Sequence, residues 1–246
     1  MLRIIFAGLF VGLFLICSIP LLLVLWIVGK FNEKAKLQCS YRIIQWAFRV
    51  VLFICGTKLD VYGEENLPKE GGALYVGNHR SIFDILIIFV TVKCPSGIIS
   101  KKEINKVPLL NSWMNNIGCL FLDRDNIKEG LKMVLEAVNR VKNGLGIIIF
   151  PEGTRSKEEG VFLPFKGGSF KIAEKSGCDV IPFSIVNAAA IFEDHKPFIK
   201  KSHVILTIGE PIVTKDLDKE HMKKIPEIAR NKVIEMHNEK APLCKR

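Results

Sequence analysis

The sequence predicts an α/β fold, with a mixed, largely parallel sheet covered by helices, preceded by an N-terminal hydrophobic helical element. Short apolar runs that suit buried strands alternate with segments of helical periodicity, a pattern typical of a largely parallel sheet with both faces covered. The N-terminal residues are also far more apolar than the rest. We therefore expect a membrane-associated helical pair over 1–57 and one globular α/β domain over 58–246.

Turn residues bound the runs that we expect to be strands. Pro182 interrupts one of these runs, which suggests a strand at a sheet edge or a strand with a bend. The apolar stretch 85–89 fits either a helix or a strand, and anchors the polar turn before it. The expected strands lie at 59–62, 73–76, 98–100, 118–122, 147–149, 180–185 and 204–208.

The clearest helix is predicted over 126–142. Asn126 can cap its first turn, and the apolar residues that follow share one face. A shorter helix is expected over 168–175. A charged surface helix is expected over 215–239, with a break near Pro226, because proline lacks the N–H that a helix interior needs.

A histidine and an aspartate follow the predicted strand 73–76. Residues 78–84 read Asn-His-Arg-Ser-Ile-Phe-Asp, which places His79 five residues before Asp84. Imidazole takes up protons near neutral pH, and a carboxylate beside it fixes its tautomer and stabilises its cation. The two side chains meet most easily if His79 lies in a turn and Asp84 in the first turn of a helix. The pattern predicts a general base.

A second polar turn follows the predicted strand 147–149. Residues 150–156 read Phe-Pro-Glu-Gly-Thr-Arg-Ser, in which Gly153 permits close backbone approach and Thr154 offers a hydroxyl. Arg155 offers a planar fork of donors that matches a phosphate or carboxylate. Glu152 is a rival base, but we favour a positioning role for it. A third block, 118–124, brings Arg124 to another strand end.

In chain order, the blocks 78–84, 118–124, 150–156 and the apolar block 180–185 resemble those of the glycerolipid acyltransferases, especially 1-acylglycerol-3-phosphate acyltransferases of the bacterial type. The resemblance directly covers about half of the chain, and the blocks 78–84 and 150–156 at their separation are very specific. It implies the glycerolipid acyltransferase fold. It also implies a set of roles: His79 and Asp84 in catalysis, Arg155, Arg124 and Lys101 in binding the substrate phosphate, Glu152, Gly153 and Thr154 in positioning the substrate, and Pro182 in the acyl groove.

The implied reaction moves a fatty acyl group from acyl-CoA or acyl carrier protein to the sn-2 hydroxyl of 1-acyl-sn-glycerol 3-phosphate (lysophosphatidic acid). Phosphatidic acid is the product. The chain contains no Gly-x-Ser-x-Gly elbow, which argues against a covalent acyl-enzyme, and no metal or redox cofactor is expected. Two alternatives remain: an acceptor that carries a headgroup on its phosphate, and a membrane-binding protein without catalytic activity.

Each site residue also has a structural alternative. His79 can cap a turn, and Asp84 can cap a helix while it supports the histidine. Arg155 and Arg124 can be surface ion-pair partners, and Lys101 can be a solvated lysine beside another. Because the four blocks occur together, we favour the functional interpretation for His79, Asp84, Arg155 and Arg124. For Lys101 the functional and structural interpretations are even.

The N-terminal hydrophobic segment has two possible arrangements. Residues 4–28 carry no charge and are long enough to cross a bilayer as a helix, but Pro20 also allows two short pieces in one leaflet. A signal peptide is disfavoured because no cleavage site follows. In 41–55, Arg42, Gln45 and Arg49 form a polar stripe on an apolar helix, which fits the membrane interface or an ordinary core helix. The resemblance implies a helical pair that dips into one leaflet.

Charge and cysteine content agree with a membrane-bound enzyme. The formal net charge of +10 favours anionic lipid headgroups, a phosphate-bearing substrate or an acidic carrier protein as partners. Nucleic acid is disfavoured because no groove-reading or base-stacking motif is present. The seven cysteines form no paired spacing, which suits a reducing compartment rather than disulfides or zinc. We expect the cell membrane, with the active site at the cytoplasmic face.

Overall fold

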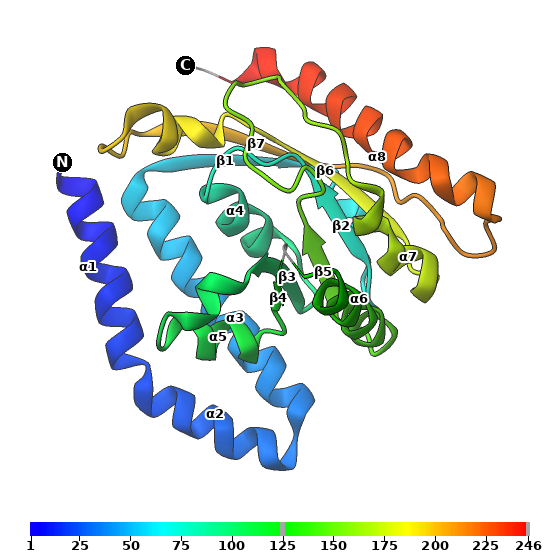
Figure 1. The fold of residues 1–246 in the computed structure, drawn as a ribbon. Coiled ribbons are helices and arrows are strands. Elements are labelled where there is room, and N and C mark those ends of the chain that lie inside the picture. The colour runs from blue at the N-terminus through cyan, green and yellow to red at the C-terminus, as the bar shows by residue number, and fades with distance from the viewer. Residues whose placement is uncertain (124–125, 245–246) are drawn as a thin grey trace.

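A seven-stranded sheet with helices on both faces forms the body of the molecule (Figure 1). The computed structural model describes residues 1–123 and 126–244. The strands follow the order β1-β7-β6-β2-β5-β3-β4. Their bounds are β1 (Thr57–Tyr62), β2 (Leu74–Gly77), β3 (Ser96–Lys101), β4 (Leu120–Leu122), β5 (Gly146–Ile149), β6 (Val180–Val186) and β7 (Ser202–Ile208).

The helices divide between the two faces of the sheet. One core cluster joins one face of the sheet to α1 through α5, and the other joins the opposite face to α6, α7 and α8. Adjacent strand residues alternate between the clusters, so Tyr75 lies in the first and Val76 in the second. The helices are α1 (Leu2–Cys17), α2 (Ile19–Phe31), α3 (Glu33–Cys55), α4 (Phe83–Thr91), α5 (Leu110–Asn116), α6 (Ile127–Lys142), α7 (Lys171–Ser176) and α8 (Lys219–Lys240), with short 3-10 turns at Glu64–Asn66, Lys102–Lys106, Gly167–Phe170, Ala188–Ile191, Glu193–His195 and Ala241–Leu243.

The sheet is mixed and largely parallel, as the sequence predicts. β2 pairs in parallel with both β5 and β6, and β3 pairs in parallel with β5 and β4. β6 and β7 pair antiparallel, while β1 runs parallel to β7. Because Val76 stands opposite both Ile149 and Pro182, the carboxyl ends of β2, β5 and β6 reach the same edge of the sheet.

Pro182 lies in an interior strand, so of the two alternatives, an edge strand or a strand with a bend, the edge strand is wrong. β6 lies between β7 and β2. Phe183 pairs with Ile208, but Val180 pairs with Ile212, which leaves one extra residue on the β7 side. Such a bulge interrupts the ladder beside Pro182, where a residue without an N–H is tolerated.

Helix α8 is continuous through Pro226, so the predicted break is also wrong. The buried residues of this helix include Met222, Ile225, Ala229 and Val233. Their spacing places them on one face, which packs against the sheet. Burial of this apolar face stabilises the helix beyond what local propensity provides, and it offsets the hydrogen bond that proline cannot make.

The N-terminal segment bends between α1 and α2. The two helices meet at an angle of 48° next to Ser18, and Pro20 lies in the first turn of α2, where its missing N–H costs nothing. In the described part of the chain, no single helix has both the length and the apolar composition to cross a membrane. The α1–α2 pair meets those two criteria only when its bent halves are taken together.

The polar stripe of α3 faces the end of α4. The Gln45 amide donates to the carbonyl oxygens of Phe89 at 2.8 Å and Val92 at 2.9 Å. Arg49 donates to the carbonyl of Val90 at 3.0 Å. These carbonyls at the C-terminal end of α4 lack partners within the helix, so the stripe caps them. Helix α3 therefore docks on the α/β body and shares its core.

Candidate active site

Two polar turns meet at the edge of the sheet where β2 and β5 end. The turn after β2 carries His79, and the turn after β5 carries Glu152 and Arg155. The N–H of Ser156 donates to the carbonyl of His79 at 2.8 Å, which joins the two turns directly. Carboxyl ends of parallel strands are a common place for ligand sites in α/β proteins.

His79 and Asp84 form a hydrogen-bonded pair. Nδ1 of His79 lies 2.9 Å from Oδ2 of Asp84, and the carboxylate is only 1% exposed. The same oxygen accepts from the N–H groups of Arg80 and Ser81, each at 2.7 Å. As the spacing predicts, the histidine lies in the turn and the aspartate in the first turn of α4. With the carboxylate at Nδ1, Nε2 is left free to accept a proton.

The imidazole ring also stacks on an aromatic ring. The centroids of His79 and Phe150 lie 4.1 Å apart with an angle of 16° between planes, and Phe183 packs edge-on against Phe150. The ring of His79 is thus held both by its hydrogen bond and by its face. The sequence placed Phe150 beside the second turn but gave no sign of this contact.

Glu152 holds the backbone of the histidine turn. Its Oε1 accepts from the N–H of His79 at 2.9 Å, and its Oε2 accepts from the N–H of Leu163 at 3.0 Å. Burial raises the pKa of Glu152 above its usual value, although both hydrogen bonds oppose the rise. A carboxylate with both oxygens turned to backbone donors suits positioning better than proton transfer.

Arg155 lies beside the same turn through Glu193. One guanidinium nitrogen of Arg155 lies 3.0 Å from Oε1 of Glu193, and the arginine side chain is 48% exposed. Glu193 also accepts from the hydroxyl of Ser81 at 2.5 Å and the N–H of Ile82 at 2.9 Å. Glu193 was missed from the sequence because it follows β6, far from both motifs.

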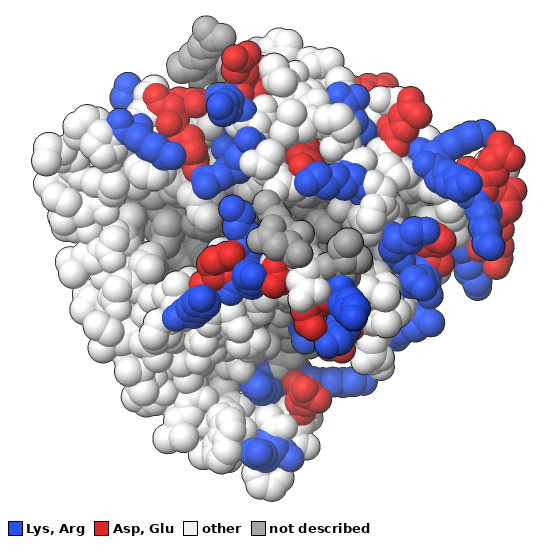
Figure 2. Space-filling view, viewed as in Figure 1, with Lys and Arg blue, Asp and Glu red and all other residues white. Residues whose placement is uncertain are grey.

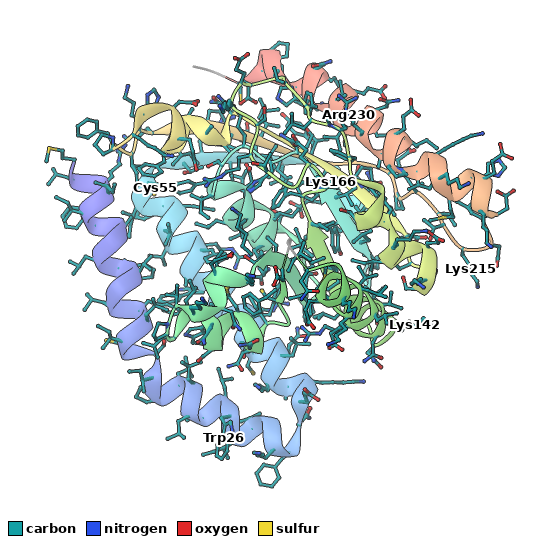
Figure 3. All side chains as sticks on the ribbon, viewed as in Figure 1. Trp26, Cys55, Lys142, Lys166, Lys215 and Arg230 are labelled. Atoms are coloured by element: carbon teal, nitrogen blue, oxygen red, sulfur yellow. The ribbon has the colours of Figure 1, made fainter. Side chains whose placement is uncertain are left out.

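Gly153 lies next to the amine of Lys166, a cation that the sequence did not link to the site. Its φ of +75° suits glycine, and a β-carbon there would lie 2.5 Å from Nζ of Lys166. Gly153 and Lys166 line a pocket of about 300 Å³. Phe150, whose ring stacks on His79, lines the same pocket. Figure 3 labels Lys166 near the middle of the molecule, among the elements of the sheet. Thr154 is exposed on the same turn.

The remaining predicted residues lie around this edge or outside the described chain. Lys101 ends β3 and is exposed. Arg124 lies outside the residues that the structure describes. Pro182 is buried and contacts Gly209, whose β-carbon would lie 3.0 Å from both Pro182 and Met236 of α8. Phosphate binding by Lys101 and Arg124 and an acyl-groove role for Pro182 stay predictions.

An imidazole backed by a buried carboxylate, with an arginine held beside the same turn, is an arrangement typical of enzymes that use a general base on an anionic substrate. Comparison with known proteins gives the particular family. The acyltransferase family model matches residues 58–186, slightly more than half of the chain. The chain belongs to this acyltransferase family.

Relatives of known name agree. A 1-acyl-sn-glycerol-3-phosphate acyltransferase of Borreliella burgdorferi is 28% identical over 197 residues, 80% of this chain and 78% of the relative. One of Helicobacter pylori is 32% identical over 174 residues, 70% of each chain. The crystal structure of the 1-acyl-sn-glycerophosphate acyltransferase PlsC from Thermotoga maritima superposes with a TM-score of 0.80 at 26% identity, covering 96% of this chain and 94% of that one.

Proposed function

We propose that this enzyme transfers a fatty acyl group from a thioester to the sn-2 hydroxyl of 1-acyl-sn-glycerol 3-phosphate, making phosphatidic acid. The observation that carries the proposal is the joint placement of the His79–Asp84 pair and Arg155, which Glu193 ties to one turn. A base and a phosphate-binding group side by side suit an acceptor that has both a hydroxyl and a phosphate. The names of the similar proteins support the same acceptor.

The mechanism follows from the free nitrogen of His79. Nε2 takes the proton of the acceptor hydroxyl as its oxygen attacks the thioester carbonyl. The carbon–sulfur bond then breaks, the new ester forms, and the imidazolium returns its proton to the departing thiolate. Asp84 stabilises the imidazolium, and general-base catalysis of this kind contributes about 10²–10⁴ in rate.

Arg155 binds the acceptor phosphate in this proposal and so places the hydroxyl near His79. Arg124 and Lys101 are the further candidates from the sequence, and Lys166 joins them because its amine lies over Gly153. No metal or redox cofactor takes part. Acyl-CoA or acyl carrier protein supplies the acyl group as a co-substrate.

The N-terminal helices hold the site at a membrane, where acceptor and product reside. The side of the molecule that carries α1 and α2 is nearly free of charged side chains, whereas charges gather elsewhere on the same view (Figure 2). Large apolar side chains are exposed along both helices, including Phe6 and Trp26. We propose the cell membrane as the location, with the site at its cytoplasmic face, where thioester donors are made.

Thiol release from an acyl thioester tests the reaction. Purified protein in detergent is given acyl-CoA or acyl carrier protein with 1-acylglycerol 3-phosphate or with lysophosphatidylethanolamine. The His79→Ala variant should lose turnover, whereas His221→Ala should not, because His221 pairs with Asp218 on the surface at the start of α8. If thiol is released with lysophosphatidylethanolamine but not with 1-acylglycerol 3-phosphate, the acceptor is a phospholipid with a headgroup. Full activity of His79→Ala would refute the mechanism.

A further inference from the structure

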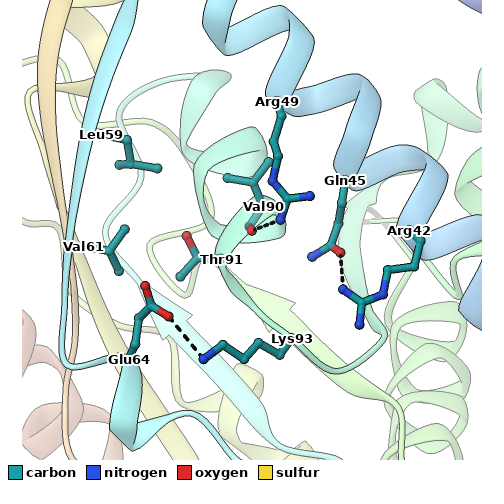
Figure 4. A pocket seen from close by; sticks show the side chains of 9 residues that line it. All are labelled: Arg42, Gln45, Arg49, Leu59, Val61, Glu64, Val90, Thr91 and Lys93. Atoms are coloured by element: carbon teal, nitrogen blue, oxygen red, sulfur yellow. Dashed lines mark hydrogen bonds and ion pairs between the residues drawn. The ribbon is translucent and has the colours of Figure 1, made fainter.

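A second basic hollow lies at the opposite end of α4 from the active site (Figure 4). Asp84 lies in the first turn of α4 and Thr91 ends it, so the two sites are separated by about 10 Å of helix. The hollow has a volume of about 560 Å³. It is lined by Arg42, Gln45 and Arg49 of α3, Leu59 and Val61 of β1, and Glu64, Val90, Thr91 and Lys93.

The charges in this hollow are mostly positive. Three cations face one carboxylate, and that carboxylate, Glu64, lies 3.2 Å from Nζ of Lys93. The two arginines instead donate to uncharged groups: Arg42 to the side-chain oxygen of Gln45 at 3.4 Å, and Arg49 to a backbone carbonyl at 3.0 Å. A guanidinium has five N–H donors. Each arginine therefore keeps donors for an anion in the hollow.

Capping of α4 does not require both arginines. Gln45 alone donates to two of the carbonyls at the end of that helix. Arg42 donates to Gln45 rather than to a carbonyl, and both arginines are exposed. In Figure 4 their side chains extend from α3 toward the end of α4. Two guanidinium groups next to each other suit a phosphate, which accepts paired hydrogen bonds.

The arginines border an apolar surface that continues onto α1. Trp46 and Phe53 lie at helical spacing from Arg42 and Arg49 and share their side of α3. Trp46 is 54% exposed and Phe53 84% exposed. The Trp46 ring also contacts Phe10 of α1, with centroids 6.0 Å apart. Arginines at such a border hold their stems along apolar surface and their charges at the headgroup level of a bilayer.

We propose that this hollow binds the phosphate of a bilayer phospholipid headgroup, at a site separate from the one that binds the acceptor. Arg42 and Arg49 hold the phosphate, and Lys93 adds charge from the loop after α4. Leu59 and Val61 give the hollow an apolar wall, and Trp46 and Phe53 lie on the side from which the acyl chains would approach. A soluble anion would gain nothing from that apolar surface, which is why we assign a lipid.

Lipid binding to the full-length protein in neutral detergent tests the proposal. The probe is a fluorescent phosphatidylglycerol, with affinity measured for the wild type and for the Arg42→Gln/Arg49→Gln double variant. Loss of two charge-assisted contacts should weaken binding by roughly tenfold or more. The matched control is Lys128→Gln/Lys132→Gln, which removes two exposed lysines from α6 and should leave binding unchanged.

Further variants distinguish this site from the acceptor site and from a folding defect. Arg155→Ala should leave phosphatidylglycerol binding unchanged, whereas a loss equal to that of the double variant would mean that the lipid occupies the acceptor site. Lys93→Gln, on an exposed loop, should weaken binding by a few fold without lowering the melting temperature. Equal affinity of all variants would overturn the proposal, as would displacement of the lipid by millimolar inorganic phosphate, which would point to a soluble anion.

Discussion

His79 is held from three directions, by one residue close to it in sequence and by two residues of the turn after β5. Asp84 accepts at Nδ1, Phe150 stacks on the ring, and Glu152 accepts from the backbone N–H. Rotation about either side-chain torsion would break one of these contacts. The site is therefore pre-organised, with Nε2 fixed before the acceptor arrives.

Asp84→Asn should reduce kcat by about 10²–10⁴ with little change in the Michaelis constant for the acceptor, because an amide cannot stabilise the imidazolium. Steady-state kinetics check this. Asp218→Asn is a matched control, since Asp218 also pairs with a histidine Nδ1, at 2.8 Å, on the surface. An Asp84→Asn enzyme that retains wild-type kcat would show that the carboxylate does not assist the base.

Glu193→Gln should act on acceptor binding rather than on the chemical step. The variant loses the charge that holds Arg155 beside the turn of Ser81 and Ile82. We expect the Michaelis constant for the acceptor to rise by roughly tenfold, the size of one charge-assisted contact, with kcat largely kept. Glu136→Gln, which removes a surface pair on α6, is the control. An unchanged Michaelis constant with a reduced kcat would contradict a positioning role.

At the scale of elements, α4 connects the active site to α3. Its first turn supplies Asp84, and its last carbonyls are capped by Gln45 and Arg49 of α3. Gln45 is only 1% exposed, and its buried amide nitrogen donates to the carbonyls of Phe89 and Val92 at the C-terminal end of α4. The position of α4, and with it that of Asp84, thus depends on a helix of the N-terminal segment.

Gln45→Leu should lower the free energy of unfolding by about 1–3 kcal/mol, because the carbonyl of Phe89 loses its side-chain donor and the carbonyl of Val92 keeps only the hydroxyl of Tyr41. Thermal unfolding in detergent measures this. Gln38→Leu, at an exposed position of the same helix, should change stability by less than about 0.5 kcal/mol. If both variants melt together, the cap does not contribute to stability.

At the scale of the whole molecule, hydrogen bonds and ion pairs join helix α8 to the turns that carry His79 and Glu152. The ring of His237 on α8 lies 2.8 Å from Glu159, and Glu159 also pairs with Arg80, the residue after His79. Arg230 of α8 donates to the carbonyl of Leu163, whose N–H donates to Glu152. Residues separated by most of the chain thereby support one site.

The contacts of Glu159 with His237 and Arg80 depend on its charge, so their contribution to stability depends on pH. Burial raises its pKa, but hydrogen bonds from His237 and the N–H of Asn187, together with Arg80, outweigh burial and leave the pKa below its usual value. A depressed carboxyl pKa stabilises the folded state above the unfolded pKa, about 4.3, and this contribution is lost as pH falls through the folded pKa. Glu159→Gln should therefore be less stable than wild type at pH 6.

The difference in stability between wild type and Glu159→Gln should shrink as the pH falls below about 4, because the wild-type carboxyl is then protonated and, like the amide, uncharged. Unfolding curves of both proteins across this range check the sign. Glu158→Gln, at the exposed neighbouring position, should show no such pH dependence. A constant difference at every pH would mean that Glu159 acts through its shape rather than its charge.

The sequence by itself determined the features that depend on neighbouring residues. The alternation of strands and helices, the mixed sheet and the Asn126 cap follow from local pattern, and the structure confirms each of them. The placement of His79 in a turn and Asp84 in the next helical turn also follows from their spacing, because five residues suffice to bring the two side chains together.

Only the tertiary structure decided which distant residues meet. Glu193, Lys166 and the stacked Phe150 carry no local pattern that links them to the catalytic turn, since chain reversals through β6 and neighbouring strands bring them there. The polar stripe of α3 fits a helix at the membrane interface or an ordinary core helix, and its contacts with the end of α4 are visible only in the structure. The proline of β6 fits either an edge strand or a bent strand, and the pairing of β6 with both neighbours excludes the edge. Periodicity shows which side of an element is polar, whereas packing decides what that side contacts.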